Sequence, residues 1–167
     1  MKQLVQSLKN EGTILLDSEV PQVSKGKVLI KTISSLVSTG TEKMLVDFGA
    51  AGYFNKARQQ PDKVKQVIQK IKTDGVAATF DAVKSKLDMP IQLGYCNVGK
   101  VCEVGNGVKG FEVGDIVVSN GSHSEYVLVP ENLCSKVPDS VSTDDAVFTV
   151  LSSIALQGVR LASPSIG

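Results

Sequence analysis

The chain has 167 residues, of which 42% are hydrophobic and 21% charged, and its formal net charge is +1. This length allows one domain with a hydrophobic core, and the composition excludes a disordered or fibrous protein. The near-neutral charge gives no electrostatic case for nucleic acid or an anionic membrane as a partner. No apolar run is long enough to span a bilayer, and residues 1–12 lack the apolar core of a signal peptide.

The first third of the chain has the patterns of β-strands. Residues 1–8 and 13–16 read as strands on either side of the turn Asn10-Glu11-Gly12. After Pro21 and Gly26, residues 27–33 are rich in β-branched side chains, which favours another strand.

The middle of the chain has helical periodicity. Pro61 suits a first helical turn, Gly75 separates two amphipathic stretches, and Pro90 ends the second. We therefore expect two helices within residues 55–88, packed outside the β core. The side chains expected to be buried share helical spacing: Val64, Val67, Ile68, Ile71, Phe80, Val83 and Leu87.

Strand patterns return at Ile91 and continue through residues 99–104, 113–118 and 124–129, before a last helix over residues 143–163. The sequence thus predicts an α+β fold that is mostly β, with a helical insert over residues 43–93.

Residues 94–105 read G-Y-C-N-V-G-K-V-C-E-V-G and resemble the signature G-H-E-x-x-G-x-V-x-x-V-G of the medium-chain dehydrogenase/reductase family. Residues 113–117, 124–126 and 37–42 are similar to three further motifs of that family, in the family's order. The resemblance covers nearly all of the chain except about residues 43–93. It implies the family's N-terminal catalytic domain, a GroES-like irregular β-barrel with this helical-hairpin insert.

The resemblance also shows where zinc ligands stand in metal-dependent relatives: a cysteine in the turn of residues 37–42, a histidine in the signature, and a third ligand near the last helix. The corresponding residues here are Thr39, Tyr95 and, approximately, Thr149, and Cys96 replaces the glutamate of the signature. Hydroxyl groups are poor zinc ligands, so we expect no metal site. The family's four-cysteine structural lobe is missing as well. We therefore expect a zinc-free member, similar in this to quinone and enoyl reductases.

Hydroxyl donors aimed at a developing oxyanion can replace the metal. By the resemblance, the catalytic candidates are Thr41, at the family's proton-relay position, with Tyr95 and Thr39. Ser152 and Ser153 lie where the last helix approaches the cofactor in relatives. Two structural alternatives stay open: Thr41 as a helix N-cap and Tyr95 as a core or rim aromatic residue.

The remaining cysteines and the one histidine carry weaker expectations. Cys96 and Cys102 read as small buried strand residues, and with Cys134 they form no C-x-x-C pair, so no disulfide framework is expected. This favours a reducing cytoplasm. His123 lacks a partner histidine and is an improbable acid or base.

Basic residues dominate the first part of the insert. Six basic residues stand against Asp62 and Asp74: Lys56, Arg58, Lys63, Lys65, Lys70 and Lys72. They form either a solvated helix face or a lid or subunit contact that favours anionic substrates, such as phosphorylated or nucleotide-linked sugars.

No G-x-G-x-x-G loop occurs in the sequence, so we expect the nucleotide-binding Rossmann domain to lie outside this chain. The resemblance then implies an NAD(P)-dependent, zinc-independent oxidoreductase for an alcohol, a carbonyl compound or a sugar derivative. The chain alone would be inactive, and the intact protein could form a homo-oligomer. The alternatives are a non-enzymatic GroES-like binding module and an interaction module built on the helical hairpin.

Overall fold

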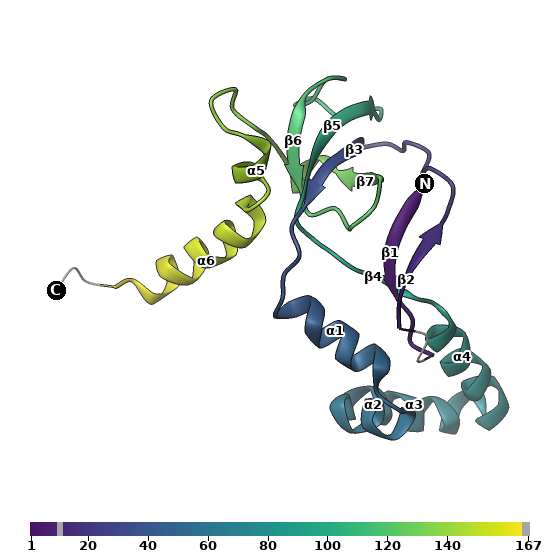
Figure 1. The fold of residues 1–167 in the computed structure, drawn as a ribbon. Helices are drawn as coiled ribbons and strands as arrows, with labels where there is room; N and C mark the ends of the chain where they lie inside the picture. The colour runs from purple at the N-terminus through teal and green to yellow at the C-terminus, as the bar shows by residue number, and fades with distance from the viewer. Residues whose placement is uncertain (10–11, 165–167) are drawn as a thin grey trace. The chain divides into compact units, whose positions relative to one another are not determined.

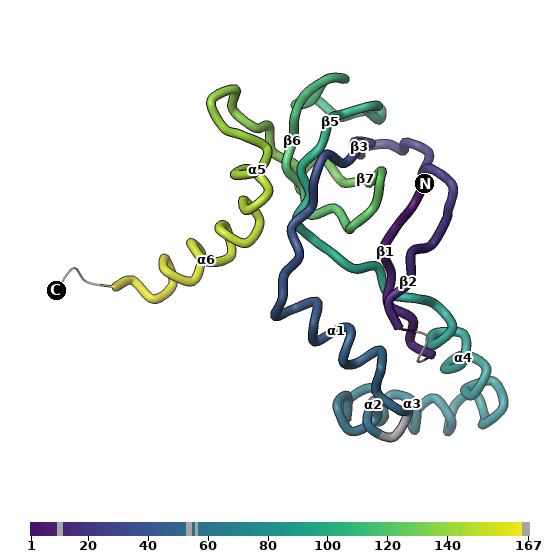
Figure 2. Tube along the Cα trace, in the orientation of Figure 1, coloured from purple at the N-terminus to yellow at the C-terminus, as the bar shows by residue number. Residues whose placement is uncertain are grey.

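The computed structural model describes residues 1–9 and 12–164 (Figures 1 and 2). The chain divides into two compact units, which are described separately. The first unit comprises Met1–Gln3, Leu16–Ser38 and Gly94–Gly167, and the second comprises Leu4–Leu15 and Thr39–Leu93.

The first unit is built on a five-stranded antiparallel sheet of order β7-β3-β5-β6-β8. Its strands are β3 (Lys27–Ser35), β5 (Asn97–Val104), β6 (Ile116–Ser119), β7 (Tyr126–Pro130) and β8 (Cys134–Lys136), and the 3₁₀-helix η1 (Glu131–Leu133) joins the last two. Strand β3 pairs with β5 on one side and with β7 on the other. The β-branched residues recognised in the sequence therefore form an interior strand of the sheet, paired on both sides.

The core of this unit consists almost entirely of valine and isoleucine. One cluster contains Val28, Ile30, Val101, Val117, Val127 and Val129. A second cluster forms where helix α5 (Thr143–Ala146) packs on the sheet, and it joins Val98 and Val118 to Ala146 and Val147. Branched side chains on neighbouring strands fill these clusters because they pack well on a pleated surface.

Two predicted strands of this unit begin later than expected. The prediction of a strand from residue 113 was wrong, because residues 113–115 belong to a turn before β6. Gly114 has a φ of +103°, and the Asp115 carboxylate accepts a hydrogen bond of 2.7 Å from the backbone N–H of Glu112. The next strand begins at Tyr126 instead of Ser124, which forms only an isolated bridge with Gln3.

The predicted last helix is also interrupted. Helix α5 ends at Ala146 and α6 (Thr149–Ala162) begins three residues later. The Thr149 hydroxyl donates a hydrogen bond of 2.7 Å to the carbonyl of Ala146, and the side chain of Val147 is buried at the break. Packing of this turn against the sheet therefore overrides the helical pattern of the sequence.

A second, three-stranded sheet has the order β2-β1-β4. Its strands are β1 (Lys2–Gln6), β2 (Thr13–Asp17) and β4 (Ile91–Gln92). Within the second unit, Val5 pairs with Gln92 and Gln6 pairs with Ile91 in antiparallel register. Residues 10 and 11 of the turn predicted between the first two strands lie outside the described residues. The α+β fold class predicted from the sequence is confirmed.

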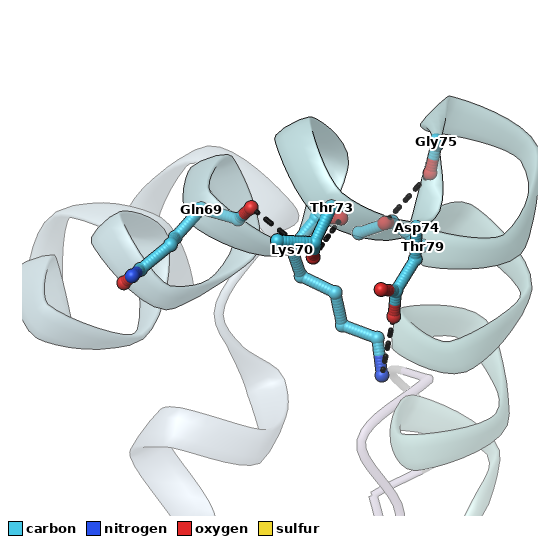
Figure 3. A network of polar contacts seen from close by, with 6 residues as sticks. All are labelled: Gln69, Lys70, Thr73, Asp74, Gly75 and Thr79. Atoms are coloured by element: carbon cyan, nitrogen blue, oxygen red, sulfur yellow. Dashed lines mark hydrogen bonds and ion pairs between the residues drawn. The ribbon is translucent and has the colours of Figure 1, made fainter.

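Four helices make up most of the second unit: α1 (Thr41–Ala50), α2 (Tyr53–Gln59), α3 (Pro61–Asp74) and α4 (Val76–Asp88). The prediction of two helices joined at Gly75 is confirmed for α3 and α4. Figure 3 shows this junction, where the Thr79 hydroxyl donates to the carbonyl of Gly75 at 2.8 Å and Lys70 pairs with Asp74 at 3.7 Å. In the part of the chain that the structure describes, no helix is long and apolar enough to cross a membrane.

The predicted burial of the helical side chains is correct in part. Val64, Val67, Val83 and Leu87 are half-buried. The predictions for the remaining three residues were wrong, since Ile68 is 51%, Ile71 37% and Phe80 67% exposed. The apolar stripes of α3 and α4 are wider than the face along which the two helices touch, which leaves apolar surface uncovered.

Candidate functional site

Thr39 and Thr41 lie at the start of helix α1 in the second unit. Both are exposed, and Thr41 is the first residue of the helix. The N-cap position belongs to Gly40, and no side chain caps the helix there, so the alternative that Thr41 is the N-cap was wrong. The structure thus puts the Thr41 hydroxyl on the exposed first turn of a helix, where it can contact a bound molecule.

Tyr95 lies in the first unit, in the short segment that leads into strand β5. It is half-buried and stands between Gly94 and the fully buried Cys96. Gly94 has a φ of +89°, and a Cβ placed there would lie 2.7 Å from the backbone nitrogen and the ring of His123. The first glycine of the signature is therefore required by the close approach of His123.

His123 makes a side-chain contact that its sequence neighbourhood does not predict. Its Nδ1 atom lies 2.7 Å from the hydroxyl oxygen of Ser35, at the end of strand β3. Which atom is the donor depends on the tautomer. An imidazole hydrogen-bonded to a hydroxyl can take up and pass on a proton. No sequence pattern could find this pair, because its members are 88 residues apart.

A buried polar network supports the segment that carries His123. Asn97 is fully buried, and its Nδ2 donates a hydrogen bond of 2.8 Å to the Thr32 hydroxyl. That hydroxyl donates at 2.5 Å to the carbonyl of Ser124, and Ser119 donates at 3.4 Å to the Asn97 side-chain oxygen. A buried network with these bonds made holds its members in one arrangement. The network thus fixes the turn before β7, where His123 lies.

The proposed cofactor residues lie on helix α6. Ser152 and Ser153 are both exposed, and the Ser153 hydroxyl donates a hydrogen bond of 2.8 Å to the carbonyl of Val150 in the same helix. Ser152 therefore has the hydroxyl that is less engaged by its own helix. Thr149, which the resemblance places approximately at a ligand position, uses its hydroxyl within the helix break already described.

The donor set does not fit a zinc ion. Among residues 1–9 and 12–164, no group of three His, Cys, Asp or Glu side chains lies close enough to hold a metal. Cys96 is buried, Cys102 is exposed, and burial raises the pKa of the half-buried Cys134 thiol to about 11. The expectation that Cys102 is buried was wrong. At Thr39, Tyr95 and Thr149 the groups available are neutral hydroxyls, which bind zinc weakly.

Comparisons with known proteins agree with this domain type. The family model described as the alcohol dehydrogenase GroES-like domain matches residues 63–139. The (R,R)-butanediol dehydrogenase of Bacillus subtilis is 32% identical over 98 residues, which are 42% of this chain and 28% of that protein.

Two solved structures share the fold over nearly the whole chain. The quinone oxidoreductase from Coxiella burnetii has a TM-score of 0.66 at 21% identity, over 98% of this chain and 45% of its own. An alcohol dehydrogenase from Escherichia coli CFT073, complexed with NADH, has a TM-score of 0.68 at 18% identity, over 99% of this chain and 46% of its own. The chain thus spans less than half the length of the relatives that it matches.

Proposed function

Because this chain is an N-terminal, GroES-like domain of the medium-chain dehydrogenase/reductase family, we propose that it is the substrate-binding, catalytic domain of an NAD(P)-dependent oxidoreductase that works without zinc. Its substrate would be an alcohol or carbonyl compound, with a sugar derivative as one candidate. What carries the proposal is the pairing of this domain type with hydroxyl residues at the positions that the resemblance assigns to zinc ligands: Thr39, Tyr95 and, approximately, Thr149.

Hydride transfer to a carbonyl carbon builds negative charge on the carbonyl oxygen, and a metal-free site needs hydrogen-bond donors for that charge. Tyr95 and Thr41 are the first candidates, and Thr39 is the third. Tyr95 is supported by its place beside Gly94, against which the His123 ring packs. In this proposal, His123 and Ser35 supply the proton that the reduced oxygen takes up.

The cofactor, NAD(H) or NADP(H), would be bound mainly by a Rossmann domain, because this sequence has no Gly-rich phosphate loop. The E. coli relative complexed with NADH supports a nicotinamide cofactor. On this chain, Ser152 and Ser153 are the proposed contacts to it, and Ser152 is favoured because the Ser153 hydroxyl already donates to the carbonyl of Val150. We place the protein in the cytoplasm, where three free cysteines stay reduced; the intact protein could be a homo-oligomer.

Elemental analysis of the chain, purified without chelator, tests the metal-free part of the proposal. We expect far less than one zinc per chain, both as purified and after incubation with excess zinc and desalting. A stoichiometric zinc that survives desalting would overturn it. In the same samples, calorimetric titration with NADH and NADPH should show no micromolar binding, since the phosphate loop is missing from this chain.

Hydroxyl deletions in the longer protein test the catalytic assignment. Tyr95→Phe and Thr41→Val remove one donor each with little change of volume, and loss of such a donor costs about 10²–10³ in rate. At least one variant should lower kcat by more than tenfold at an unchanged melting temperature. Tyr126→Phe, on β7, and Thr73→Val, on α3, are the matched controls and should retain full activity. If Tyr95→Phe and Thr41→Val both keep wild-type kcat, the assignment is wrong.

A further inference from the structure

The second unit contains a groove of about 660 Å³ along helices α3 and α4, which the proposed reaction does not use. Nine of its fifteen lining residues are apolar: Leu8, Phe48, Ala57, Val64, Val67, Ile68, Ala82, Val83 and Leu87. The volume lies in the range of about 300–1,000 Å³ that is typical of small-molecule sites. An apolar hollow of this size on a protein surface is a candidate binding site.

The polar residues of the groove give it a positive charge. They include Lys63, Lys70 and Lys86, and none of the lining residues is acidic. Lys70 is neutralised by Asp74 at 3.7 Å, as Figure 3 shows. Lys63 and Lys86 are exposed, and the described residues supply no ion-pair partner for either. The groove therefore combines an apolar surface with two ammonium groups that have no ion-pair partner among the described residues.

Two polar contacts lie beside the groove. Thr79, which lines it, is 1% exposed and bonds back to the carbonyl of Gly75, where α3 ends and α4 begins. Lys9 pairs with Asp88 at 2.7 Å, which ties the end of α4 to the segment that contains Leu8. Neither contact involves Lys63 or Lys86.

We propose that this groove binds a free single-chain amphiphile with an anionic head, of the class of long-chain carboxylates. The alkyl chain lies along Val64, Val67 and Val83, and the carboxylate is bound by Lys63 and Lys86. An ammonium group binds a carboxylate through a charge-assisted hydrogen bond, and the exposed apolar surface gains by leaving water. This binding is independent of the proposed oxidoreductase activity.

Calorimetric titration of the chain tests the ligand class, with dodecanoate, dodecanol and dodecyltrimethylammonium as probes below the concentrations at which they form micelles. Dodecanoate should bind at least tenfold more tightly than dodecanol, and the cation should bind most weakly. Each methylene buried is worth about a fourfold change in Kd, so decanoate, which is two methylenes shorter, should bind about 15-fold more weakly than dodecanoate. Equal affinity for all three head groups would overturn the proposal.

Matched variants test whether dodecanoate binds in this groove. Lys63→Gln combined with Lys86→Gln should weaken dodecanoate binding at least tenfold and leave dodecanol unchanged. Lys65→Gln combined with Lys72→Gln removes the same charge from α3 outside the groove and should have little effect. An equal loss in both pairs would mean only general attraction to a basic surface, against the proposal.

A variant with a filled groove tests whether the alkyl chain binds there. Ala82→Phe adds a ring inside the groove and should abolish dodecanoate binding, with circular dichroism and melting temperature showing that the variant folds. If it does not fold, Ala82→Leu, which adds less volume, is the second variant. A dimer in solution that Ala82→Phe converts to a monomer, together with no amphiphile binding by the wild type, would show that a second copy fills the groove and would overturn the proposal.

Discussion

Replacing Gly99 by alanine adds a methyl group between strands β3 and β5. Gly99 is buried opposite Thr32, and a Cβ placed on it would lie 2.6 Å from the Cγ2 of Ile30 and closer still to the carbonyl oxygen of Lys31. Ordinary contacts between carbon atoms are about 3.5–4.0 Å, so the strands would have to separate by roughly 1 Å. The obstacle is mainly backbone, which cannot turn away as a flexible side chain can.

The loss of unfolding free energy can be estimated from this separation of the strands. Overpacking in a close-packed region costs about 1–3 kcal/mol, and each weakened ladder hydrogen bond adds about 1 kcal/mol. We expect Gly99→Ala to lower the free energy of unfolding by about 3 kcal/mol. For a chain of this size, such a loss corresponds to a fall in the melting temperature of about 6–12 °C.

Gly158→Ala is the matched control, because the same substitution should have the opposite effect. Gly158 lies within α6, and a Cβ placed there meets nothing within 4 Å. Alanine is favoured over glycine in a helix by about 0.8–1 kcal/mol, so this variant should be as stable as the wild type or more so. Urea denaturation followed by circular dichroism measures both. A Gly99→Ala variant that unfolds at the wild-type urea midpoint would refute the predicted clash.

Two further predictions concern titratable groups. The pKa of Asp115 is held below its ordinary value of 3.8 by hydrogen bonds from Lys136 and from the backbone of Glu112. The ionised Asp115 carboxylate therefore stabilises the folded state fully near neutral pH. This contribution disappears as the pH falls through the folded-state pKa, below about pH 4. Asp115→Asn should cost about 0.2–1 kcal/mol at pH 7 and almost nothing near pH 2, by urea denaturation at each pH; an equal cost at both would contradict this. Burial raises the pKa of Cys134 to about 11, so only about one thiol in a thousand is ionised at pH 8. The exposed Cys102 should be alkylated by iodoacetamide at least tenfold faster, as located by peptide mass spectrometry, and equal rates would count against the assigned burial.

The sequence predicts those elements that depend on local pattern. The strand at residues 27–33 and the helices on either side of Gly75 follow from β-branched runs, helical spacing and turn residues. The break between α5 and α6 could not be predicted, because Val147 and Phe148 continue the apolar pattern of the helix. Whether Val147 packs on the sheet is decided by residues far away in the sequence.

The residues of the candidate site also divide into those that the sequence predicts and those that it does not. Tyr95 and Thr41 could be named from motifs, because each has neighbours in sequence that mark its position. Two other features could not be predicted: the pairing of His123 with Ser35 and the network around Asn97. Both join segments that are far apart in the sequence and that no sequence motif links. Hydrogen bonds between distant segments appear only when the sheet register is known, so the sequence could not indicate that His123 pairs with Ser35.

Several residues of the family signature have a structural role in this domain. Gly99 and Gly105 are required because a side chain would meet the backbone of Lys31 and Ser24, and Asp115 is required by the turn before β6. The structure thus gives each of these residues a role in shaping the backbone. Thr39 and Tyr95 stand outside this set of backbone-shaping residues, Thr39 exposed and Tyr95 half-buried. A match to the signature therefore predicts the domain more strongly than its reaction, and the reaction has to be argued from hydroxyl, imidazole and thiol groups one at a time.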